Sequence, residues 1–152
     1  MTTHIKLTLT ALGIAGLLTA TAAAAAEKKL QKKDLPAAVQ KALDAEVQGS
    51  TVKGFAKETE NGKTFYEVET IKNGHARDIL FDPDGHVVEV EEELAMDAVP
   101  AAAKHALAAH GKLLRVESLT KGQTVAYEGH FAKGTKPAEM KVTADGKPVT
   151  EP

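Results

Sequence analysis

The chain contains no cysteine and no tryptophan, and aromatic residues make up only 4% of its 152 residues. Without cysteine the protein has no disulfide bond, no thiol nucleophile and no cysteine-ligated zinc site. Its stability must therefore come from a hydrophobic core. The roughly 126 residues that follow a predicted 26-residue leader can supply such a core, in one compact domain or two small ones. The few phenylalanines and tyrosines all fall in segments that we expect to be strands.

A strong excess of charge of one sign is also missing. The 19 Lys and Arg residues nearly balance the 21 Asp and Glu residues, for a net charge of −2. This balance gives no reason to expect a nucleic acid or an anionic membrane surface as a partner.

Catalytic motifs are lacking as well. The sequence has no G-x-S-x-G, H-E-x-x-H or G-x-x-x-x-G-K-[ST] pattern, so it predicts no enzyme and no cofactor. Glu67 and Glu128 occupy similar positions in two similar segments and could suggest a pair of catalytic carboxylates. We interpret them instead as solvated strand positions, and we interpret Glu89 and Glu91 of the acidic run Glu89 to Glu93 in the same way. We expect Glu92-Glu93-Leu94 to be the linker between the two similar units.

The first 26 residues have the pattern of a signal peptide. A start with Lys6 precedes an apolar stretch from Leu7 to Leu18, and small residues follow from Ala22 to Ala26. We expect cleavage before Glu27 and a periplasmic or secreted protein that does not contact the membrane afterwards. An uncleaved membrane anchor is the alternative, because Leu7 to Ala26 approaches the length of a membrane-spanning helix. No cysteine follows that could carry a lipid.

The stretch from residue 55 to 91 reads as alternating strands and tight turns. Asn61-Gly62 is a strong hairpin signal, because a type I′ turn needs positive φ at both central residues. This turn places Phe55 opposite a valine and directs Phe65 to the more polar face of the pair. Pro83-Asp84-Gly85 predicts a second turn, whose register would place Arg77 opposite Glu91 as a cross-strand ion pair.

The same pattern recurs 61 residues later. Tyr66-Glu67 corresponds to Tyr127-Glu128, and Asp84-Gly85 corresponds to Asp145-Gly146. A Leu-Pro or Val-Pro step followed by an amphipathic segment precedes each copy and predicts a helix. We therefore predict an α+β fold of two tandem repeats, residues 27–93 and 94–152, each a helix packed on a three- or four-stranded antiparallel sheet that could run beside the other.

Histidines and acidic turns give weak metal-site signals. His105 and His110 are five residues apart on one predicted helix and do not share a face. Asp82-x-Asp84-Gly85 resembles the start of a calcium loop but lacks the later ligands, so a turn is the better interpretation. We predict no metal site.

The leader, the Leu-Pro-x-x-Val-x-x-Ala-Leu helix start at Leu35 and the Tyr-Glu-Val and Phe-Asp-x-Asp-Gly strands together resemble the PepSY-like family of exported bacterial proteins. That family is described as similar to the β-lactamase inhibitory protein (BLIP), which is built from tandem helix-plus-sheet units. The resemblance implies a non-enzymatic binding module, of the type that inhibits or regulates an exported enzyme such as a peptidase. BLIP has disulfides, and this chain has no cysteine to form them.

The sequence thus predicts a protein that binds an exported protein or enzyme. The candidate contacts are Phe65, on the polar face of its strand, and the turns at Asn61 and Asn73. The alternative is a periplasmic carrier of a small ligand or a metal ion, which would use the histidines and the acidic run.

Overall fold

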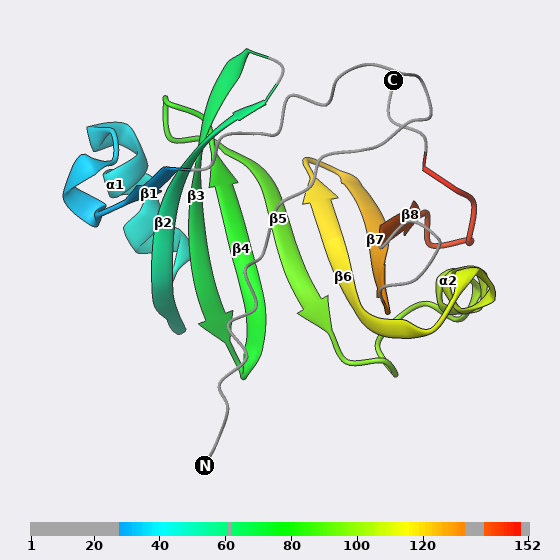
Figure 1. Cartoon of the computed structure of the whole chain (residues 1–152). Helices are drawn as coiled ribbons and strands as arrows, with labels where there is room; N and C mark the ends of the chain where they lie inside the picture. The colour runs from blue at the N-terminus through cyan, green and yellow to red at the C-terminus, as the bar shows by residue number, and fades with distance from the viewer. Residues whose placement is uncertain (1–27, 61, 133–138, 150–152) are drawn as a thin grey trace.

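A computed structural model describes residues 28–60, 62–132 and 139–149. The fold is α+β, with a single eight-stranded antiparallel sheet and two α-helices (Figure 1). The elements in chain order are β1 (Lys28–Leu30), a 3-10 helix η1 (Lys32–Asp34), α1 (Ala37–Glu46), β2 (Ser50–Glu60), β3 (Lys63–Lys72), β4 (His75–Phe81), β5 (Val87–Leu94), α2 (Ala101–His110), β6 (Leu113–Lys121), β7 (Thr124–Phe131) and β8 (Glu139–Val142). In these described ranges, no helix has the length and apolar character needed to cross a membrane. The predicted leader lies outside them.

The strands follow one another across the sheet in chain order, β1 to β8. The sequence predicts a sheet for each helix, and the structure joins all the strands into one sheet. The junction is the β5–β6 pair, which runs from Val90 opposite Thr120 to Leu94 opposite Val116. The predicted α+β class is confirmed, and the sheets of the two predicted units, which the sequence allowed to run side by side, are joined edge to edge into one continuous sheet.

The β2–β3 hairpin has the predicted register, with Phe55 opposite Val68 and Glu58 opposite Phe65. The predicted pair of Arg77 and Glu91 is wrong, because Arg77 lies opposite Glu92. Phe81 still pairs with Val87 beside the turn, but a bulge after Leu80 shifts the rest of the ladder by one residue. A shift of one residue moves a side chain to the other face of the sheet.

The bulge therefore places Glu91 on the face opposite to Arg77, while Arg77 shares the face of Ile79 and reaches α1. Its guanidinium donates a hydrogen bond to the carbonyl of Glu46, the last residue of α1, at 3.2 Å. The carboxylate of Glu46 is 3.8 Å away. A cation at the C-terminal end of a helix interacts favourably with the unpaired carbonyls there.

Helix α1 covers the first hydrophobic cluster. Its Val39 and Leu43 are fully buried against Val68, Ile79 and Phe81 of β3 and β4. The apolar positions recur every four residues, so they form one stripe along the helix that faces the sheet. The second cluster lies under α2 and contains Val99, Ala103, Leu107, Val116, Phe131 and Val142.

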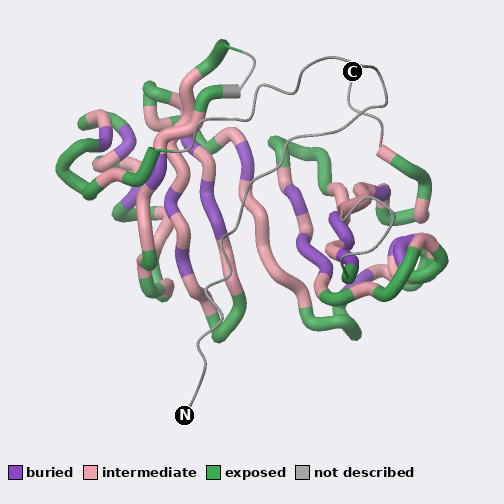
Figure 2. The backbone as a smooth tube through the Cα atoms, viewed as in Figure 1, coloured by how far each residue is buried: buried purple, intermediate pink, exposed green. Residues whose placement is uncertain are grey.

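Both helices lie on the same face of the sheet. Val90 packs against the first cluster and Leu94 against the second. These residues are four apart on β5, and side chains an even number of positions apart project from the same face of a strand. The buried residues lie along the strands and on the two helices (Figure 2). The opposite face of the sheet, which we call the helix-free face, is covered by neither helix.

Gly85 gives a test of how closely the β4–β5 turn packs on α1. Its φ is +85°, and a Cβ at this position would lie 2.7 Å from the carbonyl oxygen of Ala38. Gly74 has a similar φ of +88° but open space around it. We expect Gly74→Ala to lower the free energy of unfolding by about 1 kcal/mol, the cost of the left-handed backbone alone. Gly85→Ala should cost about 2 kcal/mol more, because the turn must also move away from the helix.

Urea denaturation of both glycine variants measures this difference. Equal losses in the two variants would show that the turn does not press on α1.

Candidate functional site

The helix-free face is rich in charged side chains. The pairing registers place these acidic residues on it: Glu58, Glu67, Glu69, Asp78, Glu89, Glu91, Glu93, Glu117, Glu128 and Glu139. The basic residues on the same face are Lys29, Lys63, Arg115, Lys121, His130 and Lys141. The two signs are unevenly distributed, since all the basic residues except Lys29 and Lys63 belong to β6, β7 and β8.

Four acidic residues of the first half form a group that we call the acidic quartet: Glu67, Glu69, Asp78 and Glu91. Glu69 lies opposite Asp78, and Asp78 lies opposite Glu91, so three carboxyls follow one another across β3, β4 and β5. Glu67 is two residues from Glu69 on the same face. Among the described residues, no lysine, arginine or histidine forms an ion pair with any member of the quartet.

The crowding of carboxyls changes their protonation. Burial, together with the charges of Glu58 and Asp78, raises the pKa of Glu67 to about 9, and Glu67 shares a hydrogen bond with Glu58. Burial and the nearby Glu89 raise the pKa of Glu91 to about 8. Burial also raises the pKa of Asp78 to about 6, although a hydrogen bond from the backbone of Thr70 opposes the shift. At neutral pH, Glu67 and Glu91 therefore retain their protons, because burial and the neighbouring acids disfavour their carboxylates and neither forms an ion pair within the described residues.

Glu69 extends toward β2, where glycine makes room for it. A Cβ at Gly54 would lie 2.7 Å from Oε2 of Glu69. The carboxyl of Glu69 thus lies against the backbone of β2, at the bulge between Val52 and Gly54. This places the quartet across four neighbouring strands.

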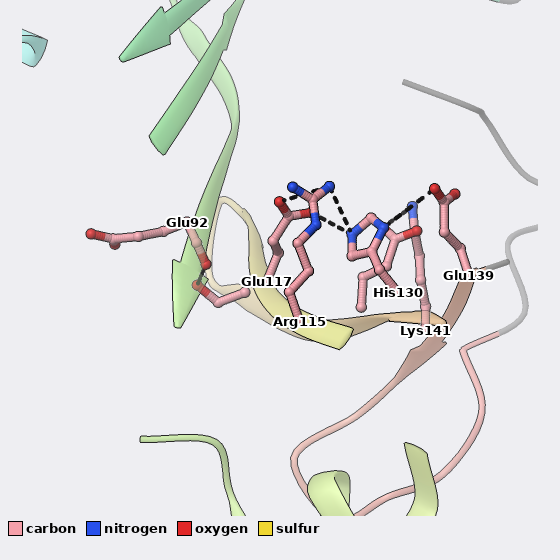
Figure 3. Close-up of polar contacts among 8 residues, drawn as sticks. Glu92, Arg115, Glu117, His130, Glu139 and Lys141 are labelled. Carbon is pink, nitrogen blue, oxygen red and sulfur yellow. Dashed lines mark hydrogen bonds and ion pairs between the residues drawn. The ribbon is translucent and has the colours of Figure 1, made fainter. Parts of the chain in front are cut away.

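The other half of the face contains an ion-pair network (Figure 3). Glu117 forms an ion pair with Arg115, at 3.3 Å, and a hydrogen bond with Nε2 of His130, at 2.6 Å. The second ring nitrogen of His130 is 3.4 Å from Glu139. Burial disfavours the charged imidazole, but the hydrogen bond and the charge of Glu117 outweigh it and raise the pKa of His130.

Two lysines pair with buried carboxylates on the face, one pair between β5 and β6 near its centre and the other between β7 and β8 at its edge. Lys121 is 3.1 Å from Oε2 of Glu89, and Lys141 is 3.6 Å from Glu128. Glu89 is only 8% exposed, and its other oxygen, Oε1, is buried without a hydrogen-bond partner within the described part of the chain. A buried carboxylate oxygen without a partner is costly, so Glu89 is the least satisfied acid on the face.

The sequence-predicted contacts do not form one site. Phe65 is half-buried on the helix-free face opposite Glu58, as predicted. Asn73 is exposed in the β3–β4 turn with a φ of 53°. It lies eight residues from Phe65 along an extended strand, which corresponds to roughly 26 Å. Asn61 lies outside the described residues.

The predicted turn at Asp82 forms as expected. The side chain of Asp82 accepts hydrogen bonds from the backbone amides of Asp84 and His86, and the backbone closes between Asp82 and His86. These bonds use the carboxylate within the turn. In the described ranges, no group of three His, Asp or Glu side chains is placed to hold a metal ion.

The interpretation of the acidic positions as solvated is wrong. Glu128 and Glu89 are each 8% exposed, and Glu67 and Glu91 are half-buried. The expected linker Glu92-Glu93-Leu94 is instead the end of β5, because it pairs with β6 in the continuous sheet. The acidic residues at alternate positions of neighbouring strands are the sequence signal that could have indicated a crowded acidic face. The predicted β5 register, one residue out, did not place Asp78 beside Glu91.

By sequence, no protein family and no curated protein matches the chain. By structure, the chain is similar to a BLIP-like protein from Bacteroides fragilis, with a TM-score of 0.58 and 19% identity over 77% of this chain and 85% of that one. It is also similar to a DUF2874 family protein from Bacteroides ovatus (TM-score 0.59, 15% identity, 76% and 85%). A protein from Bacteroides eggerthii described as periplasmic gives a TM-score of 0.56 and 24% identity, over 76% and 86%. The chain therefore has a BLIP-like fold.

Proposed function

We propose that this chain is an exported, non-enzymatic binding module that holds a partner protein on the helix-free face of its sheet. The observation that carries the proposal is the arrangement of the sheet. Both helices cover one face, and the other face has a continuous field of charged side chains that no described helix covers. A sheet face of this size offers a large surface for a protein partner.

Three further points support the proposal. The leader-like first 26 residues direct the chain to the periplasm or the exterior. The structural neighbours include a BLIP-like protein and a protein described as periplasmic. The resemblance to PepSY-like proteins and to BLIP makes an exported enzyme, such as a peptidase, the partner class that we favour, with inhibition or regulation as the outcome of binding.

The two hydrophobic clusters, one under each helix, support two repeats of one unit, 27–93 and 94–152.

The test is affinity capture from a periplasmic extract of the host, with the chain from residue 27 onward immobilised. Three forms are compared: the wild type, Glu67→Lys with Glu93→Lys on the helix-free face, and Asp84→Lys with Asp97→Lys as a control. Asp84 and Asp97 are exposed and lie outside that face. Both variants therefore replace two acidic residues with two lysines, and only one of them alters the helix-free face.

We expect one protein to be retained by the wild type and the control, and lost with the face variant. Its activity is then assayed with and without the bound chain. Retention of no protein by the wild type, or equal retention by the face variant, would contradict the proposal.

A further inference from the structure

The acidic quartet is unusual because it is close to cations and uses none of them. Lys121, Lys141 and Arg115 on the same face all pair with other acids. Glu69, Asp78 and Glu91 follow one another on adjacent strands, which are about 4.8 Å apart. Carboxylates at this spacing would repel one another, so Glu91 stays protonated in the free protein, and an added cation would allow the row to ionise.

A second observation points to the same need. Glu89 is nine-tenths buried beside Glu91, and its Oε1 has no partner within the described ranges. Lys121 occupies only the other oxygen of this carboxylate. This half of the face therefore holds a buried acceptor oxygen without a partner beside a row of carboxyls without an ion-pair partner, and a positively charged donor would be favourable next to both.

We propose that the acidic quartet receives a basic segment of the partner protein, whose arginine or lysine side chain lies across β3, β4 and β5 and displaces protons from the carboxyls. This inference rests on the proposed function and specifies the chemistry of the partner. A guanidinium or ammonium group donates several hydrogen bonds and matches a row of acceptor oxygens. Charge complementarity of this kind determines which partner surfaces can dock.

Protons are displaced on binding because the carboxyls of Glu67 and Glu91 are protonated in the free protein at neutral pH. The O–H bonds of the Glu67 and Glu91 carboxyls break, the two carboxylates pair with the incoming cation, and the protons pass to the buffer. A nearby positive charge favours the ionised carboxylate and so lowers its pKa. Binding and proton release are then linked, and the affinity increases as the pH rises.

Other charged groups on the face set the size of this effect. Glu67 is faced by Glu58, Glu69 and Asp78, all of which oppose its ionisation. Glu91 is faced by Glu89, Glu117 and Glu128, which oppose ionisation, and by Lys141, which favours it. The acids dominate at both positions, so an incoming cation has more effect here than at the ion-paired half of the face.

The experiment is isothermal titration calorimetry of the chain from residue 27 onward with hexa-arginine. Hexa-citrulline, which has the same shape without the charge, is the matched peptide. Titrations at pH 7 in phosphate and in Tris separate the heat of binding from the heat of protons taken up by the buffer. The protein variants are Glu67→Gln with Glu91→Gln, which keep the shape of the protonated acids, and the control Asp84→Asn with Asp97→Asn.

We expect the wild type to bind hexa-arginine and not hexa-citrulline, with a heat that differs between the buffers by the amount that proton release requires. Each proton released raises the affinity by up to about tenfold per pH unit between pH 6 and pH 8. The quartet variant should lose the buffer dependence and bind at least tenfold more weakly at pH 8, whereas the control variant should match the wild type.

Three results would overturn the inference: equal binding of hexa-citrulline, a heat independent of the buffer, or equal weakening in the control variant. The capture experiment is independent of these outcomes. A captured partner with no binding of hexa-arginine would support the proposed function and contradict the binding of a basic segment. Binding of hexa-arginine without a captured partner would support a cation-binding quartet and contradict the proposed function.

Discussion

The protein should be more stable at pH 5.5 than at pH 8.5. Between pH 4.5 and about 9 the folded state holds a proton on Glu67 that the unfolded state has released, and the same is true of Glu91 up to about pH 8. Stability falls with rising pH wherever the folded state binds more protons, by at most about 1.4 kcal/mol per pH unit for each group. Solvent screening reduces this for half-buried side chains, so we expect the melting temperature to fall by roughly 5 °C or more.

Other groups do not reverse this trend. Asp78 acts in the same direction between pH 3.8 and about 6. His130 has a raised pKa, so its stabilising contribution is also lost as the pH rises through that value. The lowered pKa values of Asp82 and Asp145 contribute stability above pH 3.8, which is lost only in more acidic solution.

Thermal unfolding of two variants tests this origin of the pH dependence. Glu67→Gln with Glu91→Gln should melt at a higher temperature than the wild type at pH 8.5. Its difference in melting temperature between pH 5.5 and pH 8.5 should be less than half of the wild type's. Glu92→Gln is the control, since this neighbour on β5 projects to the other face. A wild type that is more stable at pH 8.5 would contradict the assignment of protonated carboxyls to the helix-free face.

Replacing Phe81 with alanine should cause the largest loss of stability of any single change considered. Phe81 is fully buried in the first cluster, between α1 and the sheet. Truncating a buried phenylalanine lowers the free energy of unfolding by about 3–5 kcal/mol, through lost burial and the cavity left behind. Without a disulfide to restrict the unfolded chain, this loss approaches the whole stability of a small domain.

Urea denaturation followed by circular dichroism measures the loss, with Val125→Ala as the control. Val125 is 42% exposed on β7 and should change stability by less than about 0.5 kcal/mol. A loss below about 1 kcal/mol for Phe81→Ala would show that the first cluster is not the core of this fold.

Local patterns in the sequence predict the elements well. The hairpin at residues 55–68 has the predicted register, because a two-residue turn fixes which residues oppose each other. Leu35 and Val99 before their prolines predict the positions of both helices, since proline suits a helix start and the apolar residues then recur on one side. These signals act within a few residues and do not depend on the rest of the fold.

Two features depended on longer-range structure and were not predicted. The bulge after Leu80 shifts the β4–β5 ladder, so Glu91 meets Asp78 and Arg77 contacts α1. A bulge inserts one residue without a clear sequence signal. The burial of Glu89 follows from the pairing of β5 with β6, which places this strand in the middle of the sheet. Alternation of polar and apolar residues indicates which face a side chain projects from, and does not show how crowded that face is.

The central claim is that the helix-free face has carboxyls without a cationic partner. The most direct test is a carbon-13 NMR titration of the glutamate carboxyls in the free protein, with Glu67 and Glu91 assigned by their glutamine variants. We predict midpoints near pH 9 for Glu67 and near pH 8 for Glu91. Midpoints near pH 4.5 for both residues would show that the face is ordinarily solvated, and would contradict both the stability profile and the proton-linked docking of a basic segment.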